Sequence, residues 1–481
     1  MSFAMEEVSF SGVIIALCTV VSLFIYVRML TKNKQPYPPG PWSLPILGNL
    51  LQLGDHPYVF FDQMRKKYGD VFQIQLGMVP VVVVNGLDAA RHVLLKDGES
   101  FAGRPDMHTF SFFANGESLS FSVKFGESWK LQKKIAAKAL KSLAKSEAKS
   151  STCSCLLEEH VCAEASELVK TFLELSKKGS FDPVAVATCT VANVVSALCF
   201  GKRYSPSDEE FLSVIQMNHD LIKATGVFNP ADFIPCLRYL PLPAANIARV
   251  LWKVQQLCGT TCGRPLCHNV LRDITDALIN VSNERKAKEK IVTLSNEKII
   301  ITVNDIFGAV AAKVMDRPGN SRMNEFVFMF RYTVIMFAMD ISVPDKQPRN
   351  SDENSRRNCT IKDTVLNGYY IPQNTCIFIN MYQVNHDENL WIDPDIFKPQ
   401  RFLSENGELN KSLIEKVLIF GMGLRKCLGE EVARNEIFVI LTTILQQLRL
   451  EKLFEDHLDI TPVYGLSMTP RPYRMFVSQR A

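Results

Sequence analysis

The sequence has no large excess of charge of either sign. It holds 54 Lys and Arg against 50 Asp and Glu, a formal net charge of +4 over 481 residues. A balance so close to neutral is not the electrostatic footprint of a nucleic-acid-binding protein, and we expect no nucleic acid among its partners. Glycine and proline, at 24 residues each, are not in excess either, and 47% of residues are hydrophobic. These values exclude collagen-like and wholly disordered chains and predict a mostly globular protein.

Cysteine is present at modest density, and the thirteen residues are odd in number and irregularly spaced. Small secreted domains held by disulfides show dense, regular cysteine patterns, so we expect the body of this chain to lie in a reducing compartment. Cys258, Cys262 and Cys267 with His268 form a local cluster that zinc could use. Their spacing lacks the usual paired Cys-x-x-Cys form, which makes zinc the weaker interpretation.

A long uncharged run occupies residues 10–27, close to the length of about 20 residues that crosses a bilayer. Glu6 and Glu7 precede the run and Arg28 and Lys32 follow it, so the positive-inside rule places the chain after residue 28 in the cytosol. A cleaved signal peptide is the alternative. It requires positive charge before the run and a small-residue cleavage site after it. We therefore predict an uncleaved membrane anchor within residues 1–30.

The rest of the chain divides into a linker and a body. Residues 31–44 contain "PYPPGPW", whose prolines fix φ and make a stiff, extended spacer, and residues 45–481 form the body. The fold class is predicted to be mainly α with a small β region. The small, polar tract at 138–155 is expected to be a surface loop or a frayed helix end. Apolar patterning predicts a hairpin at 70–86 and further sheet at 366–380. It predicts helices at 87–95, at 155–178 and after Cys427.

The decisive segment is "FGMGLRKCLGEEVARNEIF", residues 420–438, in which a glycine-containing loop leads into a helix. Cys427 stands at the junction. Free backbone N–H groups and the positive end of the helix dipole stabilise a thiolate there, and Arg425 and Lys426 add full positive charges. Thiolate is the form of cysteine that binds iron. An isolated cysteine near a helix start is usually a packing residue, so the assignment depends on the whole spacing.

Phe420, Gly423, Arg425, Cys427 and Gly429 together fit the pattern Phe-x-x-Gly-x-Arg-x-Cys-x-Gly. With this motif the chain resembles the cytochrome P450 family of haem-thiolate monooxygenases. Further segments, among them "WKLQKK", "NDIFGA" and "FKPQRF", resemble vertebrate family 1, the branch that hydroxylates xenobiotic and aromatic compounds. The resemblance implies the cytochrome P450 fold, haem b (iron protoporphyrin IX) as cofactor, and Cys427 as the axial ligand of the haem iron.

Other residues are expected to hold the haem. Gly421 and Gly423 lack a Cβ and would let the backbone approach a flat macrocycle, while Arg425 would pair with a propionate. By resemblance, Trp129 occupies the position whose indole N–H contacts a haem propionate. Lys133 stands where the family more often has arginine, which keeps the charge but loses the bidentate fork.

The resemblance also implies partners. The family receives electrons from NADPH–cytochrome P450 reductase, with cytochrome b5 as a second candidate donor. Lys130, Lys134 and Lys426 are candidates for docking the acidic reductase. The alternative for "WKLQKK" is an exposed, solvated helix edge. With the predicted anchor, the resemblance implies a place in the endoplasmic reticulum membrane, in contact with lipid and with the catalytic body on the cytosolic face.

The substrate cavity is expected, by resemblance, around the segments "DMHTFSFFANGESLSFS" and "NDIFGA". Three phenylalanines in the first segment would line a flat aromatic slot, although we expect at least one of them to fill core instead. Such an apolar slot suits aromatic xenobiotics, steroids or fatty acids. The predicted substrate-binding residues are Phe110, Phe112, Phe113, Leu221, Asp305 and Ala309.

The chain departs from the family pattern after "NDIFGA". The family continues with Gly-x-Asp-Thr, an acid and an alcohol that deliver protons at the oxygen site, whereas this chain has Ala312 and Lys313 in their places. A cationic side chain there is costly unless it reaches solvent or loses its proton. The proton relay is therefore predicted to be lost, and no catalytic residue is assigned.

A second departure affects the family's Glu-x-x-Arg motif. Arg331 and Arg401 fit the two cations of the network that supports the cysteine loop, but Phe328 occupies the place of the glutamate. Two buried cations without their carboxylate would be expensive. Several tens of residues are also missing here, and residues 310–358 are interpreted as deleted and scrambled relative to the family.

Two functions of different classes follow from this pattern. The first is a monooxygenase that inserts one atom of O2 into a hydrophobic small molecule, with turnover impaired by the lost relay. The alternative is a catalytically inactive relative, which either binds haem without productive turnover or remains a haem-free membrane protein.

Overall fold

The computed structural model of the protein describes most of the predicted body and little before it. The described residues are 19, 22, 36–54, 57–111, 117–148, 150, 151, 153–205, 208, 209, 211, 230–239, 273–289, 294–314, 355–394, 398–452 and 473–480.

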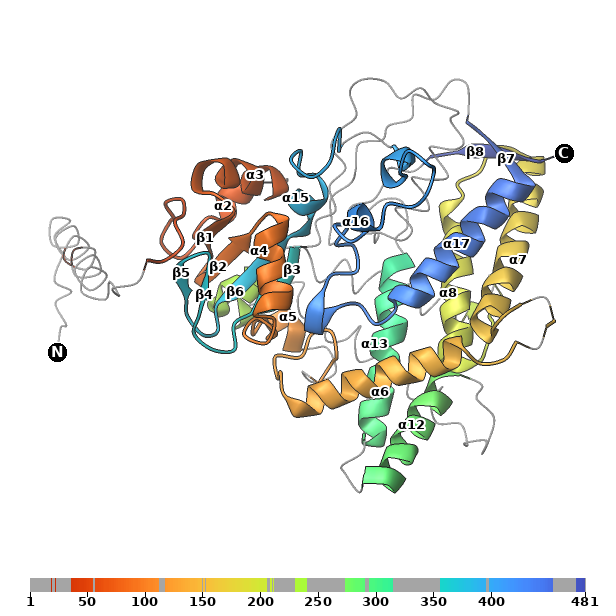
Figure 1. The fold of residues 1–481 in the computed structure, drawn as a ribbon, viewed down its shortest axis with the longest axis horizontal. Coiled ribbons are helices and arrows are strands. Elements are labelled where there is room, and N and C mark those ends of the chain that lie inside the picture. The colour runs from red at the N-terminus through yellow and green to blue at the C-terminus, as the bar shows by residue number, and fades with distance from the viewer. Residues whose placement is uncertain are drawn as a thin grey trace, which may run out of the picture.

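A four-stranded sheet lies at one end of the molecule (Figure 1). β1 (Val71–Leu76) and β2 (Val79–Val84) form an antiparallel hairpin, as predicted for residues 70–86. β6 (Cys376–Asn380) pairs parallel to β2, and β3 (Ser355–Cys359) pairs antiparallel to β6. The sheet therefore joins an early and a late part of the chain.

The remaining strands of the described residues form two smaller, two-stranded sheets. β4 (Thr364–Leu366) pairs with β5 (Tyr369–Ile371), and β7 (Leu448–Lys452) pairs with β8 (Met475–Gln479), both antiparallel. Together with β6, the first pair confirms the sheet predicted at residues 366–380.

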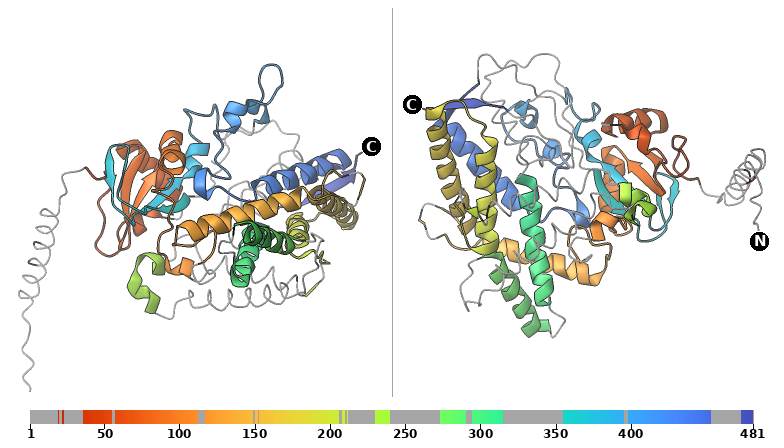
Figure 2. Two further views of the ribbon diagram at one scale, coloured as in Figure 1. Left: turned by 60° about the horizontal axis from the view of Figure 1, so that its bottom comes forward. Right: turned by 180° about the vertical axis from the view of Figure 1, so that it is seen from behind.

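Long helices gather at the other end of the molecule, where α17 lies along α7 (Figures 1 and 2). Their buried apolar faces form one large hydrophobic cluster. Mixed helix and small sheet is the content predicted from the sequence. The long helices are α6 (Glu127–Ala144), α7 (Leu156–Lys178), α8 (Val184–Phe200), α12 (Ile274–Glu289), α13 (Asn296–Val314) and α17 (Glu430–Gln447).

Helical periodicity explains the two helices predicted with the longest apolar stripes. On α7, the residues at three- and four-residue spacing are buried, among them Val161, Leu168 and Phe172. On α17, Ile440 and Ile444 are buried on one face. The structure confirms both helices. Their apolar stripes are buried because an amphipathic helix packs its apolar face against a neighbour.

Short elements connect the sheet to the helices. The helix predicted at 87–95 is confirmed and ends in a π-helical turn. The short elements are α2 (Leu50–Leu53), α3 (Pro57–Tyr68), α4 (Leu87–Arg91), the π-helix η1 (His92–Lys96), α5 (His108–Ser111), α10 (Pro230–Phe233), the 3-10 helices η3 (Pro235–Tyr239) and η4 (Pro399–Phe402), α15 (Met381–Asn385), α16 (Lys411–Ile414) and the 3-10 helix η5 (Gly423–Arg425).

The tract at 138–155 is more ordered than its composition predicts. Its first residues continue α6 as far as Ala144, and Ala139, Leu140 and Leu143 are buried there. The expected loop was wrong for this part, because three apolar residues at helical spacing outweigh the small, polar residues between them.

Part of the predicted linker lies against the body. The carbonyl oxygen of Pro36 accepts a hydrogen bond from the backbone N–H of Tyr370 at 2.9 Å, and that of Pro39 accepts from Gln73 at 2.8 Å. A Cβ on Gly40 would lie 1.8 Å from the carbonyl oxygen of Gln73. The described residues of the 31–44 segment are thus bound along β1 and β5.

Within the described residues, no helix is long and apolar enough to cross a membrane. The predicted anchor at residues 1–30 lies outside them, apart from Thr19 and Ser22. The anchor stays a prediction from the sequence.

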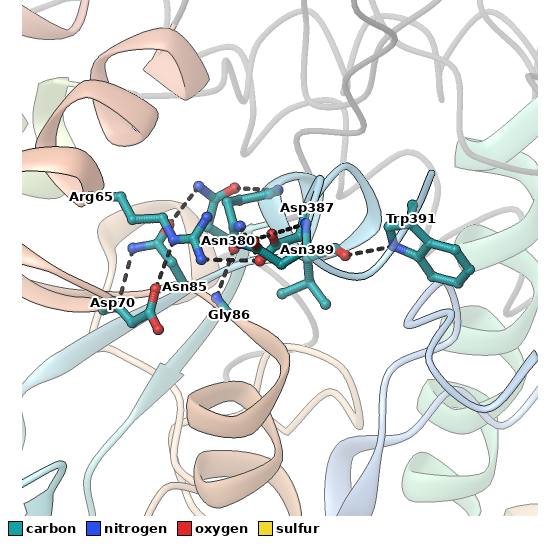
Figure 3. Close-up of polar contacts among 10 residues, drawn as sticks. Arg65, Asp70, Asn85, Gly86, Asn380, Asp387, Asn389 and Trp391 are labelled. Carbon is teal, nitrogen blue, oxygen red and sulfur yellow. Dashed lines mark hydrogen bonds and ion pairs between the residues drawn. The ribbon is translucent and has the colours of Figure 1, made fainter. Parts of the chain in front are cut away.

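A buried polar network joins α3, the hairpin and α15 (Figure 3). The carboxylate of Asp387, 6% exposed, accepts from Arg65 Nη2 (3.0 Å), from Gln383 Nε2 (2.8 Å) and from the backbone and side chain of Asn389. Gln383 Oε1 in turn accepts from the backbone N–H of Gly86 at 2.7 Å. Burial raises the pKa of Asp387, but the hydrogen bonds from Gln383 and Asn389 and the charge of Arg65 outweigh it and hold that pKa below its ordinary value.

Replacing Asp387 by alanine is expected to lower the free energy of unfolding by about 3 kcal/mol, because Arg65 and Gln383 would lose a buried acceptor. The matched control is Glu388→Ala, at an exposed neighbour, which should change it by less than about 0.5 kcal/mol. Urea unfolding of the full chain measures both. The contribution of Asp387 should be present at neutral pH and should disappear as the pH falls through its lowered folded-state pKa. Equal stability of the two variants at neutral pH would contradict the role of the network.

Candidate functional site

Cys427 lies near the end of the loop that leads into α17. The loop contains the turn η5, and the backbone N–H of Cys427 donates to the carbonyl oxygen of Phe420 at 3.0 Å. Gly429 immediately precedes the first residue of α17. Cys427 is half-buried and in no disulfide. The structure therefore places the thiol just ahead of a long helix, as the sequence predicts.

Gly423 lets the cysteine loop pack on the π-helix η1. Its φ is +66°, and a Cβ on it would lie 1.8 Å from the carbonyl oxygen of Leu94, far inside contact distance. The missing Cβ therefore permits the contact with Leu94, and the predicted approach to a macrocycle stays a prediction. Only glycine combines this left-handed backbone with so close an approach.

The guanidinium of Arg425 is buried beside the cysteine loop, with 7% of the residue exposed. Its nitrogens donate to the carbonyl oxygens of Ala102 (2.9 Å), Leu119 (2.9 Å) and Ser122 (3.4 Å). Its Cζ lies 3.9 Å from the centroid of the Trp129 ring. Carbonyl dipoles and an aromatic face both favour a cation.

Trp129 and Lys133, both on α6, hold the backbone of the site. Trp129 Nε1 donates to the carbonyl oxygen of Leu119 at 3.0 Å, the same oxygen that accepts from the buried guanidinium. Lys133 Nζ donates to the carbonyl oxygens of Leu424 and Lys426, in the cysteine loop itself. Both donors are thus directed at backbone carbonyls, and their contacts with a propionate stay predictions.

The charge distribution around Arg425 fits a bound carboxylate. Burial, together with the positive charge of Arg104, lowers the pKa of Arg425 to about 8. A carboxylate next to this guanidinium would form a charge-assisted hydrogen bond with it. This side of the site therefore fits a macrocycle that bears propionates, with Cys427 as the sulfur ligand for its metal.

The chain has extensive relatives among known proteins. A sequence model of the family described as Cytochrome P450 matches residues 38–311 and 353–477. The chain belongs to the cytochrome P450 family. It is similar to cytochrome P450 1A5 of Gallus gallus, with 40% identity over 96% of this chain and 95% of the relative. Cytochrome P450 1A1 of Chelon auratus is 39% identical over 96% of this chain and 94% of its own, and that of Oncorhynchus mykiss 39% over 97% and 95%.

These relatives confirm the resemblance to vertebrate family 1, and membership of the cytochrome P450 family implies a haem cofactor. The family match leaves residues 312–352 uncovered, within the stretch predicted to be deleted and scrambled. The alignment with the Gallus gallus relative spans 504 positions, more than the 481 residues of this chain. That relative therefore has residues for which this chain has no counterpart.

Phe110, predicted to line the substrate slot, lies in the core. On α5 it is 8% exposed, and its ring packs against Phe121 with centroids 5.0 Å apart. Strand residues of the sheet, such as Phe72 and Phe378, belong to the same cluster. Phe110 is thus one of the phenylalanines that fill core, which removes it from the predicted aromatic slot.

Asp305, also predicted to contact substrate, binds the polypeptide with both carboxylate oxygens. Oδ1 accepts from Ser118 Oγ and Oδ2 from the backbone N–H of Leu119, each at 2.6 Å. Burial raises the pKa of Asp305 to about 6, although both hydrogen bonds act to lower it. The carboxylate therefore holds the loop before α6 onto α13.

Several predicted site residues have side chains that lie outside what the structure describes. Ala309, Ala312 and Lys313 lie on α13 at positions where the structure describes the helix but not the side chains. Within the part of the chain that is described, no group of three or more His, Cys, Asp or Glu residues is placed to hold a metal ion. Outside the described residues lie Phe112, Phe113, Leu221, Phe328, Arg331 and the cluster Cys258, Cys262, Cys267 and His268.

Arg401, predicted to share a network with Arg331, binds its own loop. Its guanidinium donates to the carbonyl oxygens of Ile392 and Asp393, each at 2.7 Å, and Nε donates to that of Lys398 at 3.3 Å. Burial lowers the pKa of Arg401, against the charge of Asp393. Backbone carbonyl oxygens of its own loop thus accept the hydrogen bonds of the Arg401 guanidinium.

Two of the three predicted docking lysines are ion-paired at the surface. Lys130 Nζ lies 2.9 Å from Glu99 and 3.2 Å from Glu127, and Lys426 Nζ lies 2.6 Å from Glu430. Lys134 is exposed. Exposed pairs of this kind are weak, so a partner's acidic groups can compete for these lysines. Reductase docking stays a prediction.

Sequence reasoning missed two features of the site. The shared acceptor, the carbonyl oxygen of Leu119, is backbone and leaves no mark in the side-chain pattern. Glu436, on α17, is 2% exposed, and its Oε1 has no hydrogen-bond partner among the described residues. Burial raises its pKa well above the ordinary value. The available signal was its position one turn before Ile440 and two before Ile444, inside the apolar stripe.

Replacing Gly423 by alanine is expected to destabilise the full chain by about 3 kcal/mol or more, because the Cβ would collide with the carbonyl oxygen of Leu94 at a left-handed position. Gly429→Ala is the matched control in the same motif. Its φ is −86°, and a Cβ there meets nothing within 4 Å. Thermal unfolding without added haem compares the two variants. Equal melting temperatures would show that the loop does not depend on contact with η1.

Proposed function

We propose that this chain binds haem b through Cys427 and is a monooxygenase of hydrophobic, aromatic small molecules, with turnover impaired by its altered central region. The observation that carries the proposal is the buried cation of Arg425 two residues before a cysteine at the entry to α17. Family membership supplies the cofactor and the reaction class. Haem ligated by thiolate activates O2 for insertion of one oxygen atom into the substrate.

The residues of the cysteine loop and of α6 have separate tasks in this proposal. Cys427 is the axial ligand of the iron, and Phe420, Gly423 and Gly429 shape its loop. Arg425 compensates a propionate charge, and Trp129 and Lys133 hold the surrounding carbonyls. Because these groups are fixed by hydrogen bonds before haem arrives, little reorganisation is needed on binding.

The proposed substrates are aromatic xenobiotics, with steroids and fatty acids as further apolar classes. Similarity to relatives named cytochrome P450 1A supports the aromatic class. Phe112, Phe113, Leu221 and Ala309 are proposed to line the cavity, which sequence patterning and resemblance support. Apolar lining gives affinity through burial of the substrate surface.

The proposed setting is the cytosolic face of the endoplasmic reticulum membrane. Residues 1–30 would anchor the chain in lipid, 31–44 would lead to the body, and 45–481 would form the haem domain. Electrons would come from NADPH–cytochrome P450 reductase, or from cytochrome b5, docked near Lys130, Lys134 and Lys426. The basic flank after residue 27 and the exposed Lys134 support this arrangement.

A second candidate is a haem-binding protein without productive turnover. It is favoured by Ala312 and Lys313 in place of the acid and alcohol, and by the stretch 312–352 that the family match leaves uncovered. Without a proton donor, reduced oxygen species leave the site as peroxide before the substrate is oxidised. Peroxide release without product therefore separates this candidate from the first.

Cys427→Ser is expected to abolish the absorbance typical of thiolate-bound haem, because a hydroxyl does not replace a thiolate as iron ligand. Cys236→Ser, at an exposed cysteine, is the matched control and should keep the spectrum. Difference spectra of the reduced, carbon monoxide-treated proteins test both. Survival of the thiolate-type band in Cys427→Ser would show that another residue ligates the iron.

The double variant Ala312→Asp with Lys313→Thr is expected to raise product formation per NADPH consumed by roughly tenfold or more, since it restores an acid and an alcohol. A planar aromatic substrate, NADPH and reductase are supplied, and product and peroxide are measured together. The single variant Lys313→Ala serves as control, because it removes the cation without restoring the relay. No gain in the double variant would assign the impairment to the missing residues and not to the relay.

A further inference from the structure

One residue joins α13 to the cysteine loop through its backbone. The N–H of Leu119 donates to Asp305 on α13 at 2.6 Å, beside the hydrogen bond from Ser118 Oγ to the same carboxylate. The carbonyl oxygen of Leu119 accepts from Trp129 Nε1 at 3.0 Å and from Arg425 Nη1 at 2.9 Å. A displacement of Leu119 would therefore move one shared acceptor away from both Trp129 and Arg425.

Asp305 attaches this segment to α13. Both of its oxygens receive short, charge-assisted hydrogen bonds, which are stronger than bonds between neutral groups. The neighbouring attachment, Glu117 to Lys298 at 3.4 Å and to Lys124 at 3.3 Å, is partly exposed. Partly exposed ion pairs contribute little, so Asp305 is the stronger of these two attachments of the segment to α13.

We propose that Asp305 is a positioning residue of the haem site, which holds the Leu119 carbonyl in place and through it the Trp129 indole and the Arg425 guanidinium. The inference rests on the proposed function, because it assigns a role within the same site. It differs from the substrate contact predicted for Asp305, since the carboxylate acts through the polypeptide. Loss of the carboxylate should therefore loosen the cysteine loop, which Asp305 itself does not contact.

Hydrogen–deuterium exchange of the full chain, followed by mass spectrometry, tests this chain of contacts. Asp305→Ala removes both hydrogen bonds to the carboxylate. Ser118→Ala removes the side-chain bond and, with it, the acceptor of the Ser120 and Phe121 N–H groups, so the amides at 423–428 are its decisive readout. Glu297→Ala is the matched control, at an exposed position on the same helix. In Asp305→Ala we expect amides at 118–120 and at 423–428 to exchange roughly tenfold faster or more. Ser118→Ala should show a smaller rise at both segments, and Glu297→Ala none.

Faster exchange at 118–120 with no change at 423–428 would overturn the proposal, because Asp305 would then anchor only its own contact. If Asp305→Ala does not fold, Ser118→Ala decides the matter, since it leaves the backbone hydrogen bond of Leu119 intact. Unchanged exchange at 423–428 in Ser118→Ala would then count against the positioning role. Asp305→Asn, which keeps an acceptor oxygen for Leu119, should recover most of the protection.

A second measurement separates this inference from the proposed function. Haem transfer to an excess of apomyoglobin is followed for each variant, and we expect Asp305→Ala to release haem roughly tenfold faster than Glu297→Ala. Equal release rates would contradict the positioning role while leaving Cys427 ligation intact. A wild-type chain that takes up no haem would instead contradict the proposed function, and the exchange comparison would still decide the role of Asp305.

Discussion

Burial of the positive charge of Arg425 is the constraint around which the described site is organised. A guanidinium removed from water must receive hydrogen bonds in fixed directions, and here they come from Ala102, Leu119 and Ser122. Those acceptors lie in the loops after η1 and before α6, so one side chain of the cysteine loop binds two segments far from it in sequence. The face of Trp129 completes the pocket. A propionate beside Arg425 would add a charge-assisted hydrogen bond to these contacts.

The chain therefore combines a cysteine loop that the family match covers with a central region, 312–352, that it leaves uncovered. The cysteine loop is fixed by backbone contacts with η1 and by Lys133, whereas Ala312 and Lys313 stand where the resemblance predicts the proton-delivering pair. Haem ligation and proton delivery are separate physical tasks, carried by different segments of the chain. A protein can keep the first and lose the second, which is why we place haem binding ahead of efficient turnover.

The sequence predicted what depends on local periodicity and on side-chain identity. The stripe of α7, the hairpin β1–β2 and the junction at Cys427 follow from such patterns and are confirmed. What depends on distant backbone was not predictable. Nothing local shows that Gly423 meets Leu94, or that the Leu119 carbonyl serves two donors. Phe110 was assigned to a cavity by its aromatic side chain and Asp305 by the resemblance of its segment to the family. Nothing local shows that Phe110 packs in the core or that Asp305 binds the loop before α6.

The carbon monoxide difference spectrum of the reduced, full-length chain expressed in membranes tests haem ligation by Cys427 most directly. We predict a strongly red-shifted Soret band, as thiolate-bound haem gives, with haem and protein present in comparable amounts. Absence of that band, with the protein confirmed to be present, would contradict haem ligation by Cys427. It would mean that the altered central region has removed the haem site despite the intact cysteine loop.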